Sequence, residues 1–338
     1  MAKKKENKKE KKKKEEPTYY GGQAVMEGVM MRGKTAYAMA VRKPDGEIVI
    51  IEKPLSGLAK RFPFLKWPLI RGVTALCSSM ALGFSALSQS ADIAFDGIEE
   101  DTEPPKTWIG RKAANFESFL ERKLGDKLNE VIKWFAMLLA IVIALGLFML
   151  LPAFIGTLIP VTPALTGVIE GIVRIVIFVG YVFLVSRSKD IQRVFMYHGA
   201  EHKAINCHEL NLPLTAENVR KCNKLHKRCG TSFMLVVMVI TMLLFMVVSV
   251  TFPNSGINEN IWLRFASRIL LLPLIAGLSY EVSVKWAGRR DNFLVRLIIY
   301  PGMLMQRLTT KEPDDAQIEV AVTALEKVLV QELPEAME

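Results

Sequence analysis

Four long apolar runs alternate with charged stretches along the chain. Residues 134–151 and 231–252 carry no charged side chain, and residues 163–186 and 261–284 form runs of similar length that contain a few charges. A helix that crosses a bilayer needs roughly 20 predominantly apolar residues. The pattern therefore predicts a mainly α-helical, multi-pass membrane protein with about four transmembrane helices.

Charged positions inside two of these runs need an explanation. Glu170 and Arg174 are four residues apart, so they share a helical face and are expected to pair, either as an intramembrane functional site or, as we favour, as a clamp between helices. Arg264 and Arg268 lie near the start of the fourth run, where long side chains can reach the membrane interface.

A fifth apolar segment, residues 72–91, is uncharged but rich in Ser, Ala and Gly. If it crossed the membrane, residues 92–133 would be placed outside with seven Lys and Arg, against the positive-inside rule. We therefore favour a re-entrant or interfacial helix that packs through its small residues, with a fifth span as the alternative.

The distribution of Lys and Arg sets the orientation. The connections at 152–162 and 253–260 contain none, whereas residues 187–228 contain nine and the chain from residue 285 onward contains seven. Positive charge is retained in the cytoplasm. Both termini and the central loop are thus expected to be cytoplasmic, with the protein in the cell membrane.

The flanking segments differ in character. Residues 1–16 are nearly all Lys and Glu with no apolar core following, so we expect a disordered solubilising tail and no cleavable signal peptide. Residues 19–33 contain four glycines, which suit tight turns and close backbone approach. Residues 35–42 and 47–53 flank Pro44-Asp45-Gly46 and predict a β-hairpin.

Two amphipathic helices are expected as well, at residues 110–133 and after Pro313-Asp314-Asp315. In the second, apolar positions follow helical spacing: Ile318, Ala321, Val322, Leu325 and Leu329. The predicted organisation is a disordered basic tail (1–17), a Gly-rich segment with a hairpin (18–60), an interfacial or re-entrant helix with an amphipathic helix (61–130), a transmembrane hairpin (131–185), a cytoplasmic loop (186–230), a second transmembrane hairpin (231–284) and cytoplasmic helices (285–338).

Composition supports this reading. In 338 residues, 51% are hydrophobic and 23% charged, with a net charge of +10, and the apolar residues are concentrated in runs. This excludes a purely soluble enzyme and a disordered protein. The expected partners are the bilayer, including anionic lipid, and a membrane protein or a second copy of the chain; no specific nucleic acid is expected. In the reducing cytoplasm the loop cysteines should not form disulfides.

Candidate chemistry is confined to the central loop, which holds all four histidines and three of the four cysteines. His198 and His202 are four residues apart, so their imidazoles share a helical face and can bind one metal ion. With Glu201 they form H-x-x-E-H, the inverted zinc-protease signature in which the Glu activates water. His226 and Cys229 add further ligands nearby. The alternative is that the two histidines are solvated, the cysteines are unreactive, and no metal binds.

A ligand from a distant segment is also conceivable. Glu281, at the cytoplasmic end of the fourth run, is one candidate, although it could equally pair with Lys285 one turn later.

The sequence resembles a bacterial membrane-protein family known as domain of unknown function 1385, described as predicted metal-dependent enzymes. The resemblance extends over nearly all of residues 18–330. Its most specific parts are residues 21–33 (GGQAVMEGVMMRG), 197–203, 226–233, 277–281 and 306–315 (QRLTTKEPDD). It implies a metal site at His198, Glu201, His202, His226, Cys229 and Glu281. One departure is Lys227, where the family pattern has Pro; this alters a turn but removes no ligand.

Two functions fit these features. The first is a metal-dependent hydrolase at the cytoplasmic membrane face, with a divalent metal ion (zinc expected) on His198 and His202, completed by Glu281 or His226, and with Glu201 as general base. The second is a non-catalytic factor for membrane assembly, insertion or transport, in which a closed ligand set including Cys229 would make the metal structural.

The topology can be tested directly. Tags inserted at residue 157 or 256 should be accessible from outside intact cells, and tags at residue 210 or the C-terminus only after permeabilisation, because of the charge asymmetry. Labelling of a cysteine at position 210 by an impermeant reagent in intact cells would overturn the orientation.

Overall fold

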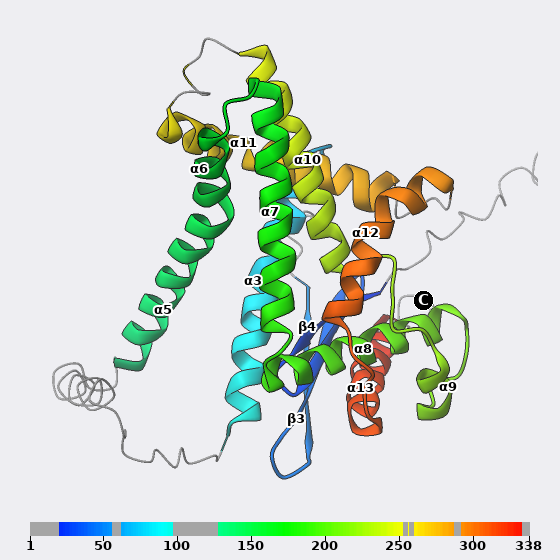
Figure 1. Cartoon of the computed structure of the whole chain (residues 1–338). Coiled ribbons are helices and arrows are strands. Elements are labelled where there is room, and N and C mark those ends of the chain that lie inside the picture. Colours follow the sequence, from blue (N-terminus) through cyan, green and yellow to red (C-terminus); the bar gives the residue numbers. More distant parts are fainter. Residues whose placement is uncertain are drawn as a thin grey trace, which may run out of the picture.

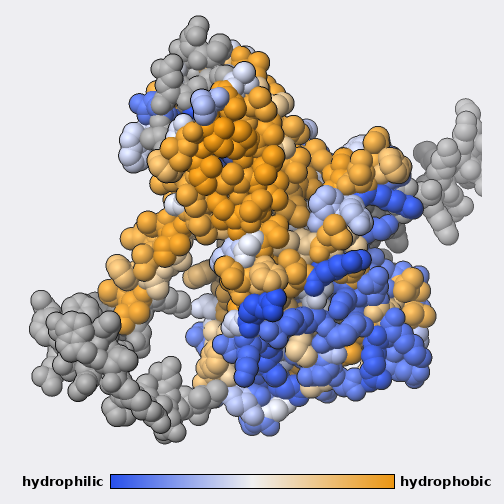
Figure 2. Space-filling model, in the orientation of Figure 1, coloured by the Kyte–Doolittle hydropathy of each residue, from blue (hydrophilic) through white to orange (hydrophobic). Residues whose placement is uncertain are grey.

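The computed structural model describes residues 20–55, 62–96, 128–252, 256, 260–286 and 292–332. Apolar helices form one part of the molecule, and a small sheet flanked by further helices forms the other (Figure 1). Hydrophobic residues dominate the surface of the first part, and hydrophilic residues that of the second (Figure 2). The expected tail (1–17) and most of the amphipathic helix expected at 110–133 lie outside the described residues.

The sheet is antiparallel, with its strands in chain order: β1 (Gly21–Val25), β2 (Gly28–Arg32), β3 (Ala36–Arg42) and β4 (Ile48–Pro54). The predicted hairpin is confirmed, since Arg42 pairs with Ile48 across the turn that contains Pro44-Asp45-Gly46. Gly46 adopts φ +93° there, a conformation that glycine reaches without steric cost.

The Gly-rich segment forms a second hairpin, β1–β2, which the sequence pattern did not predict. Its turn places Glu27 at φ +48°. Four of the five residues of β2 are buried, because helices cover both faces of the sheet. A strand covered on both sides lacks the alternation of apolar and polar residues by which strands are recognised.

One face of the sheet packs against α8 (Lys189–Glu209) and α13 (Asp315–Glu332). The shared core comprises Val29, Met31, Ala38 and Ala40 from the sheet, Tyr197, Ala200 and Ala204 from α8, and Ile318, Ala321 and Leu325 from α13. The predicted C-terminal helix is thus confirmed. It begins with a capping box, in which Gln317 N–H donates to Asp314 Oδ1 (2.8 Å) and Asp314 N–H donates to Gln317 Oε1 (3.0 Å).

The opposite face of the sheet is covered by α3 (Ile70–Ala94), whose Ala86 and Ala94 pack on Met30 and Met39. The start of α3 lies against α11 (Ile261–Tyr280), where a Cβ added to Gly72 would approach Gly277 Cα to 2.8 Å. α3 is one of five described helices that are long and apolar enough to cross a membrane. Because its second half covers the sheet, we still favour the interfacial or re-entrant placement.

The four other candidate spans are residues 134–158, 164–185, 230–251 and 262–286. They are formed by α5 (Leu128–Leu145) with the π-helical turn η3 (Gly146–Leu150) and α6 (Leu151–Leu158), by α7 (Pro163–Val185), by α10 (Gly230–Thr251), and by α11 with the π-helical segment η4 (Glu281–Trp286). The short α9 (Ala216–Lys221) and the amphipathic α12 (Phe293–Thr309) complete the described chain after α8 and η4.

The first span is longer than predicted. Pro152 was expected to begin a connection, but the helix continues through it to Leu158. Proline removes one helical hydrogen bond and crowds the preceding turn. The π-helical turn directly before α6 changes the bonding register at this point and accommodates the proline.

The predicted pair of Glu170 with Arg174 is wrong. Glu170 instead bonds Arg264 (2.9 Å) and Arg268, while Arg174 Nε donates to the carbonyl of Phe148 (2.8 Å). The two arginines of α11 do not extend to the interface either, since they are 7% and 2% exposed. Because α7 and α11 both pack against α6 and α10, two guanidinium groups meet one carboxylate, and sequence spacing within α7 could not reveal this.

Gly199 sits where α8 meets the chain before α13, and a Cβ there would overlap the carbonyl oxygen of Lys311. Gly199→Ala should therefore lower the free energy of unfolding by about 2 kcal/mol, because a well-packed backbone must shift. Thermal unfolding in detergent measures this. Gly180→Ala, in α7 with no atom within 4 Å of the added Cβ, is the matched control and should be neutral or slightly stabilising. Equal effects of the two substitutions would contradict the packing argument.

Candidate metal centre

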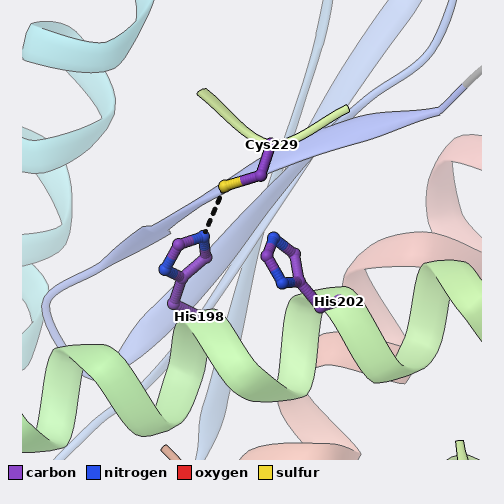
Figure 3. A group of neighbouring side chains, drawn as sticks. All are labelled: His198, His202 and Cys229. Carbon is purple, nitrogen blue, oxygen red and sulfur yellow. Dashed lines mark hydrogen bonds between the residues drawn. The ribbon is translucent and has the colours of Figure 1, made fainter. Parts of the chain in front are cut away.

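His198 and His202 project from the same face of α8, one turn apart, with ring centroids 4.4 Å from each other (Figure 3). The predicted helix is present, and Asp190 lies in its first turn, where a negative charge favours helix formation. Packing of Ala200 and Ala204 against the sheet and α13 fixes the rotation of α8 about its axis. This rotation turns the two imidazoles toward the start of α10.

Cys229 completes a group of three possible ligands. It immediately precedes α10, and its Sγ lies 3.2 Å from His198 Nε2 (Figure 3). One ligand atom from each of His198, His202 and Cys229 lies within 4.8 Å of the other two. Two imidazole nitrogens and a thiolate are a donor set typical of zinc.

Backbone carbonyls orient both imidazoles. His198 Nδ1 lies 2.8 Å from the Thr309 oxygen, and His202 Nδ1 lies 2.6 Å from the Lys224 oxygen. A carbonyl can only accept, so each Nδ1 carries a proton, and in the neutral imidazole Nε2 then keeps its lone pair. His202 Nε2 is buried and has no hydrogen-bond partner among the described residues. This is the tautomer and the carbonyl support that metal-binding histidines generally have.

Burial keeps the side chains of His202, His226 and Cys229 uncharged. It lowers the pKa of His202 to about 2, with a further decrease from the neighbouring His198, and it lowers the pKa of His226 to about 4. Burial also raises the pKa of the Cys229 thiol, and hydrogen bonds from Thr231 and Ser232 act in the opposite direction. Neutral imidazoles at neutral pH are ready to bind a cation, whereas the thiol must lose a proton to do so.

Glu201 lies beside this group, on the side of the β1–β2 hairpin. A Cβ added to Gly22 would approach the Glu201 Cγ and Cδ atoms to 2.9 Å, so only glycine fits against this side chain. Burial raises the pKa of the Glu201 carboxyl to about 8. Its Oε2 is buried with no hydrogen-bond partner in the described part of the chain. Such a carboxyl is poised to exchange a proton near neutral pH.

Two predicted ligands lie outside the group of three. The ring of His226 is 5.7 Å from that of His202, and its Nε2 faces Glu209 Oε1 at 3.6 Å. Glu281 forms a bidentate ion pair with Arg71 of α3, at 2.7 and 2.5 Å. The expected alternative for Glu281, a pair with Lys285, is replaced by this contact between α11 and α3.

The remaining loop cysteines and histidine serve other purposes. Cys207 and Cys222 belong to the core between α8, the sheet and α13. His208 packs edge-on against Tyr20, with ring centroids 5.1 Å apart.

The C-terminal end of α12 also supports the site, a role that its residue types did not predict. There Gln306 binds the loop before Cys229, and the Thr309 carbonyl binds His198. The only available signal was that residues 306–315 resemble the family pattern. Every residue type carries a backbone carbonyl, so the sequence cannot show which carbonyl binds a histidine.

The chain thus combines apolar helices that indicate a membrane protein with a polar unit that carries a His–His–Cys group. It belongs to the family described as protein of unknown function (DUF1385), which matches residues 67–331. The uncharacterized protein YqhQ of Bacillus subtilis (strain 168) is 35% identical over 314 residues, which cover 92% of each chain. No solved structure matches the protein.

Metal content tests the ligand set. Loss of a group that only supports a metal ligand lowers metal affinity roughly 10- to 100-fold. We expect a larger decrease in metal affinity when a ligand itself is removed, in each of the variants His198→Ala, His202→Ala and Cys229→Ser. Elemental analysis of purified protein, with chelator competition, measures this. His208→Ala, Glu281→Gln and His226→Gln are the controls and should keep the wild-type content. Full metal content in the His198→Ala/His202→Ala double variant would show that the pair binds no metal.

Proposed function

We propose that the protein is a metal-dependent hydrolase that acts at the cytoplasmic face of the cell membrane. One observation carries the proposal. Ligand atoms of His198, His202 and Cys229 lie close together, and the buried Oε2 atom of Glu201 beside them has no hydrogen-bond partner among the described residues. A purely structural core would rarely retain such polar atoms without partners, because each costs about 1–3 kcal/mol.

The residues fit a divalent metal, with zinc as the expected ion. His198, His202 and Cys229 would hold it, and the carbonyls of Thr309 and Lys224 would keep the imidazoles in place. Three protein ligands leave a position open for water or substrate, as in catalytic zinc sites. When bound, the metal would supply Lewis acidity that polarises a substrate oxygen and acidifies water.

Glu201 would act as the general base. It follows His198 by three residues and precedes His202 directly, so it stands next to the ligands without being one of them. In this role it would accept a proton from the attacking water and pass it to the leaving group. General base catalysis of this kind contributes typically 10²- to 10⁴-fold in rate.

The position of the site suggests where the substrate comes from. Cys229 directly precedes α10, a candidate membrane span, so the three ligands lie where that helix begins. Lys227 and Arg228 stand immediately before Cys229 in the chain, and Arg228 pairs with Glu209. A substrate with an anionic group at the membrane surface would be favoured there.

A second function has one observation in its favour. His226 lies close enough to His202, at 5.7 Å between ring centroids, that a change of its rotamer could supply a fourth ligand. A closed set of four would make the metal structural. The protein would then be a non-catalytic factor for membrane assembly, insertion or transport, with the metal joining α8 to the start of α10.

Glu201→Gln separates the two functions. The variant keeps the size of the side chain but removes the base, so it should retain metal and abundance in the membrane while failing to complement loss of the gene. Glu217→Gln, on the surface of α9 where Glu217 pairs with Lys221, is the control and should complement fully. Complementation by Glu201→Gln would indicate a structural metal, and loss of its metal would mean that Glu201 is itself a ligand.

A further inference from the structure

The two edge strands of the sheet differ in how they are protected. β4 ends in Glu52-Lys53-Pro54, and charged residues and proline are the usual means by which an edge strand avoids pairing with another chain. β1 has the sequence Gly21-Gly22-Gln23-Ala24-Val25, with no charged side chain and no proline. The edge formed by β1 therefore lacks the protection that the edge formed by β4 has.

Main-chain groups of β1 point away from the sheet at every second residue. In an antiparallel pair, the N–H and C=O of one residue face the neighbouring strand, and those of the next residue face the other way. Val25 and Gly28 close the two-residue turn between β1 and β2, so their main-chain groups face each other. Those of Gly22 and Ala24 consequently point outward. The Gly22 N–H confirms this direction, because it donates to the Glu201 carboxyl group of α8.

The other outward groups of β1 are unpaired. Among the described residues, neither the N–H and C=O of Ala24 nor the C=O of Gly22 forms a hydrogen bond on this side. Gly21 and Gly22 are exposed, and neither has a side chain that would keep another chain at a distance. Such a row of free main-chain groups is a template for an added strand.

This edge adjoins the candidate metal centre. Besides its contact with Gly22, the Glu201 carboxyl group lies close enough to His198 and Cys229 for an electrostatic interaction with each. In Figure 3 strands of the sheet pass behind the three ligands, and α8, which carries both histidines, packs against β1. A chain segment paired with β1 would therefore lie beside the proposed general base.

We propose that the free edge of β1 binds an extended segment of a polypeptide as an added strand. The inference rests on the hydrolase function proposed above and names its substrate class: the bound polypeptide is the substrate. Ala24 and the Gly22 carbonyl would pair with the main chain of the segment, a mode of recognition that depends little on residue type. A lipid headgroup or a small anion would bind only N–H groups, and would leave the two carbonyl oxygens without partners.

The reaction would be hydrolysis of a peptide bond in this segment. The water oxygen would join the carbonyl carbon, and the C–N bond would break. The proton that Glu201 accepts from the water would go to the amine nitrogen that leaves. Acidic side chains in the segment would supply the negative charge that is favoured near the membrane surface.

Binding can be measured apart from catalysis. Full-length Glu201→Gln protein in nanodiscs should not cut its ligand, and the amide oxygen of the new side chain can still accept from the Gly22 N–H. The probe is fluorescently labelled, reduced and carboxymethylated α-lactalbumin, an unfolded protein whose segments are free to pair with an edge strand. Fluorescence anisotropy gives the dissociation constant. We expect saturable binding, and absence of binding would overturn the proposal.

Ala24→Pro, introduced into the same protein, tests the edge. Proline removes the outward N–H but no hydrogen bond between β1 and β2, and its ring lies where the added strand would approach. Binding should weaken about tenfold or more. Ile50→Pro is the matched control. It lies in β4, on the side of the strand that already contains Pro54, and should bind the probe like its parent. Equal binding by Ala24→Pro and its parent would refute the edge as the binding site.

Gly21→Lys decides if Ala24→Pro does not fold. A Cβ added at Gly21 meets no atom within 4 Å, so this variant should fold, and lysine on an edge strand opposes pairing with another strand. Binding should weaken severalfold, and unchanged binding would refute the proposal. Probe binding that appears only after deletion of residues 1–17 would show that this segment fills the edge in the native protein, which would refute the proposal as well.

Cleavage of the probe by protein with an intact Glu201 distinguishes failure of this inference from failure of the proposed function. Cleavage that falls about tenfold in Ala24→Pro, in line with binding, supports both. Cleavage that Ala24→Pro leaves unchanged would keep the hydrolase and refute the role of β1. Binding through β1 without any cleavage would keep the binding edge and refute the polypeptide as the substrate.

Discussion

The buried side chain of Gln306 joins the segments on which the candidate metal centre depends. Its Oε1 accepts from the His226 N–H (2.9 Å), and its Nε2 donates to the His226 carbonyl and to Ser232 Oγ, both at 2.8 Å. One side chain thereby satisfies both backbone groups of a buried loop residue, each of which would cost about 1–3 kcal/mol if left unpaired. The same helix ends one turn later with the carbonyl that holds His198. α12 therefore holds two parts of the site in place relative to each other: the loop that carries Lys224 and Cys229, and the helix α8.

The candidate metal centre and the ion pairs of Glu170 with Arg264 and Arg268 lie toward opposite ends of α10. Cys229 precedes the first residue of α10, whereas Phe245 and Ser249 lie beside these ion pairs. Sixteen to twenty residues of helix separate them, about 24 to 30 Å. The metal centre contains His202, which burial keeps neutral, whereas the other centre contains two arginines, which stay charged. In both, carbonyl oxygens outside regular α-helical bonding, those of Lys224 in the loop and Met149 in the π-helical turn, receive the donors.

The N-terminal hairpin takes part in the metal centre as well as in the sheet. Gly22 closes one side of the Glu201 carboxyl, and Glu27 in the hairpin turn binds Arg193 and the Tyr197 hydroxyl on α8. These contacts connect the first described residues with the helix that carries both histidines.

The sequence by itself determined the features that depend on periodicity and local chemistry. Spacing within a short segment predicts four of these features: the long apolar runs, the hairpin at Pro44-Asp45-Gly46, the C-terminal helix with its apolar stripe, and the His pair on one helical face. Cys229 was recognised as a candidate for the same reason, its nearness to the other soft ligands in one loop. Only the tertiary structure decided which distant groups meet. Glu281 pairs with Arg71, Glu170 pairs with the arginines of α11, and the two imidazoles donate to backbone carbonyls. Such contacts depend on how the helices pack, so no periodic pattern in the sequence reveals them.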